Sequence, residues 1–170
     1  MSKVLVYTEA HDNTVKSVAL EILGKLAGQE IEVAVIGNLG DEGVKDLAAN
    51  GAGTIHKLTG AGLEQYSPEG YSKALKSLID KGGYDYVFAG ATSAGKDLMP
   101  RLAGMFDAGM ASEVTNFTMD GGTFAGTRPL FAGKVLAKVE IDGPKPHFVT
   151  VRPNALGMTE GVSAGAGTVA

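Results

Sequence analysis

Residues 86–104 read YVFAGATSAGKDLMPRLAG, and this stretch decides the fold. It begins with a short apolar run, continues through a loop with a glycine at each end, and leads into a helical segment. A buried strand that passes through a glycine loop into a helix is the building unit of an α/β protein. Ligands of such sheets lie at the carboxyl ends of the strands, so this loop is the first place to look for function.

The same alternation fills the chain before this stretch. Apolar runs at residues 3–9, 31–36 and 54–58 predict three further strands. The segments between them predict amphipathic helices, because apolar residues recur there at helical spacing behind capping residues. The expected caps are His11, Asp12, Asn13 and Thr14 for the first helix, Asp41 for the second, and Ser67 with Pro68 for the third. This pattern predicts a three-layer αβα architecture, a mainly parallel twisted sheet with helices on both faces.

From about residue 110 the rhythm changes. Residues 110–119, 123–127, 134–141 and 146–151 read as strands, and no helical pattern lies between them. Asp142 and Gly143 supply a turn before the last of these strands. The sequence therefore predicts a C-terminal antiparallel β meander attached to the parallel sheet.

Composition limits the classes of protein. The chain has 170 residues, of which 44% are hydrophobic and 20% charged, as expected for one domain with a real core. The 15 basic residues less the 19 acidic residues give a net charge of −4, which disfavours a nucleic-acid partner. Cysteine is absent, which excludes disulfides and thiolate metal sites. We expect no metal, no membrane insertion and, because Met1 leads directly into a strand, a cytoplasmic protein.

The C-terminal residues differ in composition from the rest of the chain. Glycine, alanine and serine dominate after Gly161, which is typical of a flexible linker. Two explanations are open, a frayed tail or a connection to a further domain. We therefore expect an α/β domain at residues 1–153 and a linker at residues 154–170.

The loop after the strand at residues 86–89 nearly matches the phosphate-binding pattern G-x-x-x-x-G-K-[ST]. The candidate residues are Gly90, Thr92, Ser93, Gly95 and Lys96. Asp97 stands where a hydroxyl should hold Mg²⁺, and Pro100 suggests that the helix begins near Asp97. A tight connection with an exposed lysine is favoured over a phosphate site. The three histidines are scattered, and we expect no catalytic residue in this chain.

Each of the three arginines lies beside a proline, at Arg101, Arg128 and Arg152. An arginine next to a proline suits a fixed, bidentate contact with a carboxylate or phosphate. An internal salt bridge and a contact with a partner both remain open for these residues.

Two long motifs go beyond a generic α/β protein. The first combines residues 90–104 with residues 109–114, and the second combines residues 128–134 with residues 149–154. Together with the opening VLVYTE, they resemble the N-terminal domain of the electron transfer flavoprotein alpha subunit. The sequence departs from that family at Lys134, where asparagine is common.

The resemblance implies a heterodimer with a beta subunit that carries electrons on FAD from flavin dehydrogenases to an acceptor. It implies a FAD-binding C-terminal domain, absent from this sequence, that follows the linker, and AMP in the beta subunit. This chain would then be a partner-binding scaffold rather than an enzyme. The interface candidates are Arg101, Arg128, Phe131, Lys134 and Arg152. The alternative is a stand-alone adenine-nucleotide-binding module that uses residues 90–96.

Overall fold

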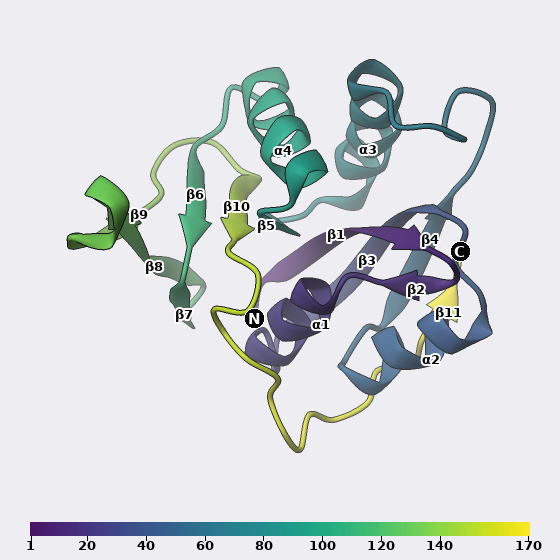
Figure 1. Ribbon diagram of the computed structural model, residues 1–170, viewed down its shortest axis with the longest axis horizontal. Helices are drawn as coiled ribbons and strands as arrows, with labels where there is room; N and C mark the ends of the chain where they lie inside the picture. Colours follow the sequence, from purple (N-terminus) through teal and green to yellow (C-terminus); the bar gives the residue numbers. More distant parts are fainter.

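The chain folds around a parallel sheet, as the alternation of strands and helices predicts. The computed structural model describes all 170 residues (Figure 1). The strands of this sheet are β1 (Lys3–His11), β3 (Glu30–Gly37), β4 (Thr54–Leu58), β5 (Tyr86–Gly90), β6 (Met110–Val114), β10 (His147–Val151) and β11 (Thr168–Val169). Their order is β11-β4-β3-β1-β5-β10-β6, and every neighbouring pair is parallel. β1 is therefore central, and the chain crosses from one side of it to the other between β4 and β5.

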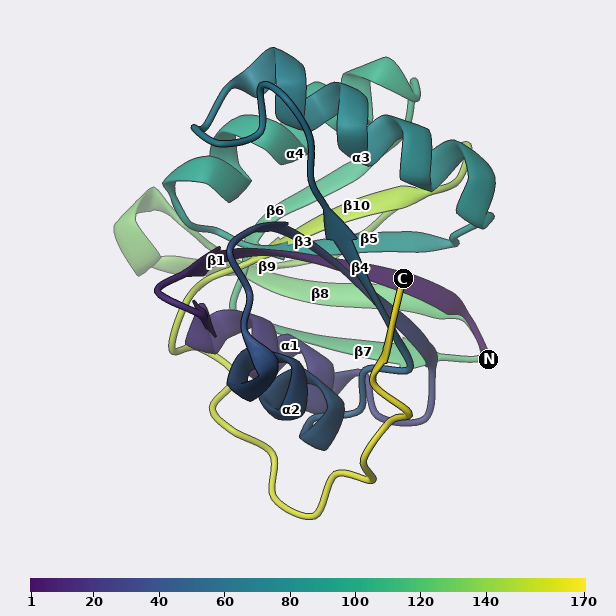
Figure 2. The ribbon, with the colours of Figure 1, turned by 90° about the vertical axis from the view of Figure 1, so that its right-hand side faces the viewer.

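Helices cover both faces of the sheet, so the predicted three layers are confirmed. α1 (Ser17–Lys25) and α2 (Asp41–Ala49) lie on one face, and α3 (Pro68–Gly82) and α4 (Ser93–Met105) lie on the other (Figure 2). The first pair buries Ile22, Leu23 and Leu47 against the sheet, and the second pair buries Leu75 and Leu102.

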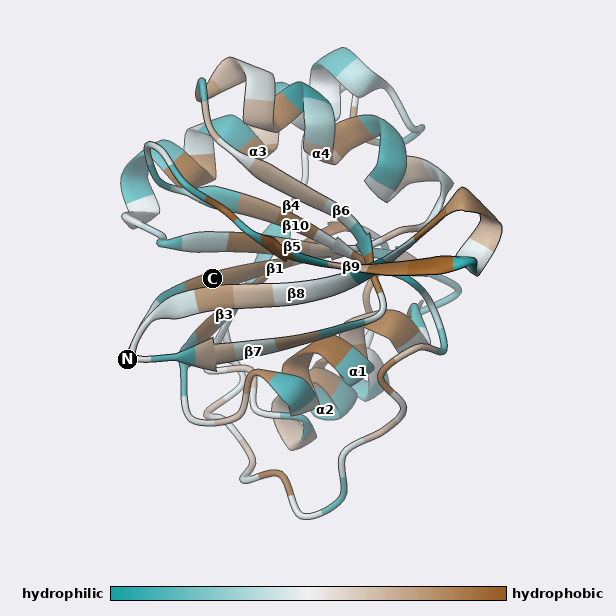
Figure 3. Cartoon of the chain, turned by 90° about the vertical axis from the view of Figure 1, so that its left-hand side faces the viewer, coloured by the Kyte–Doolittle hydropathy of each residue, from teal (hydrophilic) through white to brown (hydrophobic).

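A separate antiparallel sheet completes the face that α1 and α2 leave open. It consists of β7 (Asn116–Asp120), β8 (Thr123–Leu130) and β9 (Val135–Glu140), in that order. β7 and β8 run along the parallel sheet on the same side as α1 (Figure 3). The rings of Phe117 and Phe124 lie 5.0 and 6.2 Å from the ring of Phe88 on β5. The predicted meander therefore supplies part of the core.

The strand predicted at residues 146–151 forms as β10, but its predicted place in the antiparallel meander was wrong. β10 lies between β5 and β6 in the parallel sheet and is parallel to both. All five of its residues are buried. A strand buried on both faces belongs inside a parallel sheet, whereas the edge of a meander would expose it. The segment around Asp142 and Gly143 therefore returns the chain to the main sheet and closes no hairpin with β10.

The single strand expected at residues 110–119 is two strands. β6 lies in the parallel sheet and β7 lies in the antiparallel one, with Thr115 between them. Glu113 has a left-handed backbone, with a φ of 52°, and the pairing of β6 with β10 shifts register there. This irregularity turns the chain from one sheet into the other.

The expected cap of the first helix was also wrong. Asp12 and Asn13 have φ values of 48° and 63°, and they form the tight turn between β1 and the short antiparallel strand β2 (Thr14–Val15). Such hairpin turns need two residues with positive φ, a role that Asp and Asn fill well. α1 begins only after this hairpin, with Lys16 as its N-cap. The cap expected for the third helix is confirmed, since Ser67 Oγ accepts a hydrogen bond from Gly70 N–H ahead of Pro68.

Residues 154–170 have fixed contacts in the structure, although their composition is that of a flexible linker. They run below α1 and α2, and their last residues form β11 at the edge of β4 (Figure 1). The domain boundary near residue 153 and the continuation into a further domain stay predictions.

Phe124→Ala is expected to lower the free energy of unfolding by about 3–5 kcal/mol, because the ring is 1% exposed and packs against β5. Urea denaturation of the chain measures this change. The matched control is Phe131→Ala, which removes a ring that is 76% exposed and should change stability by less than about 0.5 kcal/mol. Equal losses in the two variants would contradict a core role for the meander.

Candidate functional site

The glycine loop lies at the carboxyl end of β5, beside the end of β1, where doubly wound sheets bind their ligands. α4 begins at Ser93, and its N-cap is Thr92, whose Oγ1 accepts a hydrogen bond from Gly95 N–H at 3.1 Å. The expected start of the helix near Asp97 was therefore wrong. Pro100 lies inside α4, where it cannot donate the helical hydrogen bond to the Lys96 carbonyl.

Both glycines of the motif are explained by packing. A Cβ on Gly95 would lie 1.9 Å from the Gly90 carbonyl oxygen, and a Cβ on Gly90 would lie 2.3 Å from Val18 Cγ1. Gly95 thus lets α4 pack closely against the end of β5, and Gly90 lets α1 approach from the other face. Neither glycine is needed to open a cradle for phosphate.

The polar groups of the loop bind each other. Thr92 Oγ1 donates a hydrogen bond to Glu9 Oε1 at 2.7 Å, and Lys96 N–H donates to the Thr92 carbonyl at 2.9 Å. The cavity between the ends of β1 and β5 has a volume of about 10 Å³, roughly that of one water molecule. A wider hollow of about 470 Å³ opens beside it at the ends of β1 and β3, and its lining includes the carboxylates of Glu9, Asp12 and Glu64 but no lysine or arginine.

Two carboxylates lie beside this loop. Glu9 bonds to Thr92, and Asp97 accepts a hydrogen bond from Tyr66 Oη at 2.5 Å. Both carboxylates place negative charge beside the position that a phosphate would occupy, and they would repel its negative charge. Ser93 is exposed. The loop therefore reads as a tight connection between β5 and α4.

Three of the predicted basic residues converge on Glu113 at the end of β6. Lys96 Nζ forms an ion pair with Glu113 Oε1 at 2.8 Å. Two backbone hydrogen bonds bring the arginines to this place. The backbone N–H of Arg152 donates to the Val114 carbonyl, and the backbone N–H of Thr115 donates to the carbonyl of Thr127, which precedes Arg128. A hydrogen bond from Lys96, together with the charges of Arg152 and Arg128, lowers the pKa of Glu113 below its usual value against the opposing effect of burial. We call Lys96, Arg128 and Arg152 the basic cluster.

The basic cluster has more positive charge than its single carboxylate neutralises. Neither Arg128 nor Arg152 has an acidic group within 4.0 Å, and the buried Nε of Arg128 has no hydrogen-bond partner. Arginine without an internal partner suits a contact with an anionic group from outside the chain. Arg101 differs, because its guanidinium contacts Glu69 at 3.4 Å and so links α4 to α3.

The remaining interface candidates lie on an arm that projects from the parallel sheet. The arm consists of the end of β8, the 3₁₀ turn η1 (Phe131–Gly133) and β9. Phe131 and Leu136 are 76% and 67% exposed, and Figure 3 shows apolar residues at this end of the molecule. Phe131 and Ala132 also have positive φ, at 49° and 55°, which is unusual for residues other than glycine. Lys134 lies exposed at the same turn.

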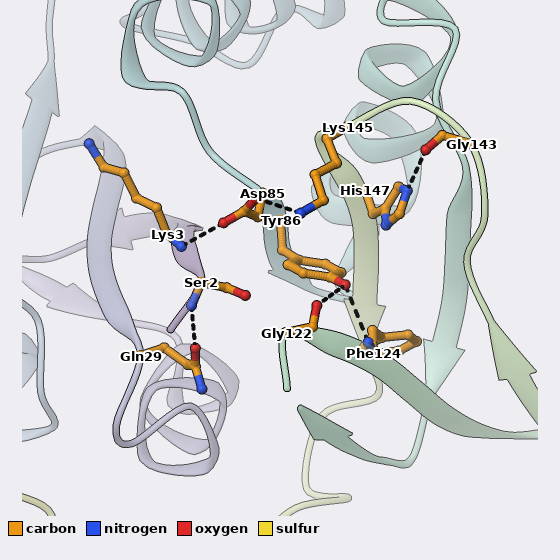
Figure 4. A network of polar contacts seen from close by, with 10 residues as sticks. All are labelled: Ser2, Lys3, Gln29, Asp85, Tyr86, Gly122, Phe124, Gly143, Lys145 and His147. Atoms are coloured by element: carbon orange, nitrogen blue, oxygen red, sulfur yellow. Dashed lines mark hydrogen bonds and ion pairs between the residues drawn. The ribbon is translucent and has the colours of Figure 1, made fainter. Parts of the chain in front are cut away.

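The opposite, amino edge of the sheet carries a network of polar contacts that holds elements together (Figure 4). Tyr86 Oη donates to the Gly122 carbonyl at 2.9 Å and accepts from Phe124 N–H at 3.2 Å. These bonds tie the turn between β7 and β8 to β5. The carboxylate of Asp85 accepts from Lys3 N–H at 2.9 Å and from Lys145 Nζ at 2.6 Å. The network thus links β1, β5, the turn between β7 and β8, and the segment before β10, and its role is structural.

The three histidines occupy separate settings. His11 is exposed beside Asp12, whereas His56 contacts a carboxylate on β3. His147 is buried, its Nε2 donates to the Gly143 carbonyl at 3.1 Å, and its ring meets Tyr86 edge-on (Figure 4). No three His, Asp or Glu side chains of the chain converge as metal ligands would.

Glu32 is a further polar centre, on the α3 side of the sheet, that the sequence analysis missed. Its carboxylate accepts hydrogen bonds from Tyr84 Oη at 2.6 Å, His56 Nε2 at 2.6 Å and Lys3 Nζ at 2.9 Å. Burial raises the pKa of Glu32, but these hydrogen bonds outweigh burial and hold the pKa at about 2. The available signal was a glutamate between Ile31 and Val33, inside an otherwise apolar strand.

Glu9 and Glu113 were also missed as partners of the loop. Glu9 follows an apolar run and Thr8 near the end of the first strand, at the edge of the sheet where ligands lie. Glu113 gave no local signal, because only the fold brings it to Lys96.

Comparison with known proteins gives the family. Residues 4–170 match the electron transfer flavoprotein domain. The chain belongs to the electron transfer flavoprotein family. The alpha subunit of Bacillus subtilis is 31% identical, over 98% of this chain and 52% of the relative. The alpha subunit of Clostridium acetobutylicum is 30% identical, over 88% of this chain and 47% of the relative.

A second group of relatives in this family has the name FixB. The FixB protein of Azorhizobium caulinodans is 32% identical, over 92% of this chain and 45% of the relative. The chain thus spans about half the length of the curated relatives it matches. The expected resemblance to alpha subunits is confirmed, and a stand-alone nucleotide module is not favoured. None of the helices is long and apolar enough to cross a membrane.

Glu32→Gln is expected to lower the free energy of unfolding near neutral pH. It should also make that free energy depend less on pH between 4.5 and 2. A folded-state pKa of about 2, below the ordinary value of 4.5, means that the charged form stabilises the fold above pH 4.5. This stabilisation is lost as the pH falls from 4.5 toward 2, so the two proteins should converge there. Urea denaturation at a series of pH values measures the effect. Glu30→Gln, at an exposed neighbour 3.9 Å from Lys3, is the control and should follow the unmodified chain.

Calorimetric titration with ATP and Mg²⁺ is expected to give no heat of binding, because Glu9 and Asp97 place negative charge beside the loop and the Thr92 hydroxyl is already bonded to Glu9. Lys96→Ala should behave in the same way. A binding heat that Lys96→Ala abolishes would overturn our reading of the loop as a structural connection.

Proposed function

We propose that this chain is the N-terminal, partner-binding scaffold of an electron transfer flavoprotein alpha subunit. The observation that carries the proposal is the match of residues 4–170 to the family, over about half the length of relatives named as alpha subunits. The parent heterodimer would accept electrons from flavin dehydrogenases and pass them to an acceptor, in the cytoplasm. The chain itself would be a subunit of an electron carrier and no enzyme.

The residues at the carboxyl ends of the strands support a scaffold role. The cavity between β1 and β5 holds only about 10 Å³, and the hollow of about 470 Å³ beside it is lined by the carboxylates of Glu9, Asp12 and Glu64 and by no lysine or arginine. Such a lining does not fit the negatively charged pyrophosphate of FAD. FAD would be held by the part of the parent subunit that this sequence does not include, and AMP would be held by the beta-type partner.

The arm and the basic cluster supply the surface for that partner. Phe131, Val135 and Leu136 are exposed apolar side chains on one projection, and such patches mark interfaces. Arg128 lies on β8, which pairs with the strand of Val135 and Leu136, and its Nε is buried and unpartnered. A partner surface with an apolar hollow and a neighbouring carboxylate would satisfy both features. Lys134 and Arg152 would lie at the rim of this contact, whereas Arg101, paired with Glu69, would lie away from it.

The alternative function is a stand-alone adenine-nucleotide-binding module built on residues 90–96. The carboxylates beside the loop and the hydrogen bonds within it count against it. We therefore retain the scaffold as the single proposal.

Co-expression with a beta-type subunit of the same source tests the proposal. The two chains are expected to co-purify as a heterodimer in size-exclusion chromatography, without flavin on this chain. Phe131→Asp and Arg128→Gln should each weaken the complex at least about tenfold, as residues at the centre of an interface do. Lys73→Gln, at an exposed lysine on α3, is the control and should leave binding unchanged.

Two results would contradict the proposal. One is the failure of the folded chain to bind any beta-type partner. The other is a complex that neither Phe131→Asp on the arm nor Arg128→Gln in the basic cluster weakens, because the interface would then lie elsewhere. Phe131→Ala, which should keep its stability, separates loss of binding from loss of folding.

A further inference from the structure

The first observation is a buried carboxylate on α1 that has no cationic partner. Glu21 is 3% exposed, and each of its oxygens accepts hydrogen bonds from backbone N–H groups. The donors are Asn154 at 3.1 Å, Leu156 at 3.2 Å and Gly157 at 3.1 Å. A buried charge is costly unless it is hydrogen-bonded, and charge-assisted hydrogen bonds are the strong ones. Glu21 therefore fastens the chain to α1 directly after β10.

The second observation lies at the far end of the same segment. Gly165 N–H donates to the Ala48 carbonyl at 2.8 Å, and Gly167 N–H donates to the Ala52 carbonyl at 3.0 Å. β11 then pairs with β4, and Ala170 both donates to Ile55 and accepts from Lys57. These bonds fasten residues 165–170 to the end of α2 and to the edge of the sheet.

The glycines of this end are required by close approach. A Cβ on Gly165 would lie 2.1 Å from the Ala52 carbonyl oxygen. Gly167 has a φ of +60°, and a Cβ on it would lie 2.7 Å from Ala48 Cβ. An alanine at position 165 could not dock. The composition that suggests flexibility thus includes positions where only glycine permits the contact.

The segment between the two fastenings crosses a hollow. A cavity of about 350 Å³ is lined by residues 159–165 together with Gln29, Ile31 and Gly51. Thr159 approaches α1 at Gly24, where a Cβ would lie 2.8 Å from the threonine Cβ. Residues 158–164 therefore span the hollow, while hydrogen bonds hold both ends.

We propose that residues 154–170 are a strap belonging to this domain, and that the strap carries the chain to the β4 edge of the sheet. The strap leaves β10 on one side of β1 and ends beside β4 on the other, below α1 and α2 (Figures 1 and 2). The strap also covers the backbone groups of β4, which an open edge strand would expose to other chains.

The strap gives the proposed scaffold a defined point of attachment. If a flavin-binding part follows, as the proposed function holds, its tether begins at β4 and not at residue 153. That point lies at the end of the sheet opposite to β6 and the arm. The fastening itself does not depend on the proposed function, and it is testable on this chain without flavin or partner.

Hydrogen exchange of the 170-residue chain tests the two fastenings. The amides of Thr168 and Ala170 are expected to exchange at least about tenfold more slowly than in an unstructured peptide. Gly165→Ala should abolish that protection and leave β1 unchanged, whereas Ala166→Ser, at an exposed neighbour, should retain it. Glu21→Gln should speed exchange at Asn154, Leu156 and Gly157, because the amide of the glutamine cannot accept all three bonds. Unprotected amides at residues 165–170 of the unmodified chain would overturn the strap.

A distance measurement tests where the strap leads. Because the chain has no cysteine, Lys73→Cys with Ala170→Cys gives two defined sites for spin labels. We expect one narrow distance distribution, which Gly165→Ala broadens. A broad distance distribution in the doubly labelled chain without Gly165→Ala would show that the chain is free after β10, and it would overturn the proposal. Neither outcome bears on whether the chain binds a beta-type subunit, so failure of the strap and failure of the scaffold are distinguishable.

Discussion

Burial of β1 on both faces is the constraint on which the rest of the structure depends. Its side chains alternate between two cores, with Val4 and Val6 facing α1 and Leu5 and Tyr7 facing α3 and α4. Each such side chain contributes roughly 1.5–3 kcal/mol when it leaves water. Neither face can be left open, so the chain must supply covers on both sides and must cross β1 to do so. The crossing places the ends of β1 and β5 together, and the hydrogen bond from Thr92 to Glu9 joins the segments that follow them.

The same requirement explains the meander. α1 and α2 cover part of this face, and α1 reaches β5 at Gly90, but β10 and β6 extend beyond them. Phe117 and Phe124 from β7 and β8 fill this place, and the Tyr86 hydroxyl fixes their turn. β9 then pairs with β8 beyond the reach of the core, and its burial pattern is mostly exposed. Val135 and Leu136 are thus apolar residues that the fold has no face left to bury, which is the physical basis for placing a partner there.

The sequence predicts what depends on local chemistry. The strand and helix alternation, the cap at Ser67 and Pro68, and the objection to a phosphate site at Asp97 all rest on residues close together in the chain. The placement of β10 could not be predicted, because its neighbours β5 and β6 are chosen by burial and not by the turn at Asp142. Asp12 and Asn13 suit both a helix cap and a hairpin turn, and only the pairing of β1 with β2 decides between them. For the candidate site, the basic residues were visible, but Glu113 and Glu21 acquire their partners through the fold.

A glycine can make a chain flexible, or it can allow two backbones to approach closely. Gly95 and Gly165 both face a backbone carbonyl at a distance that admits no Cβ, yet Gly95 lies in the first turn of α4 and Gly165 in a segment with the composition of a linker. Composition cannot separate a glycine that permits motion from one that permits contact, because the contact partner of Gly165 is Ala52, far away in sequence. If the contact holds, the arm at one end of the sheet and the end of the strap at the other are joined by parallel strands that pair continuously across β1. The partner and the tether would then be held at a fixed separation, which is the property a scaffold domain must supply.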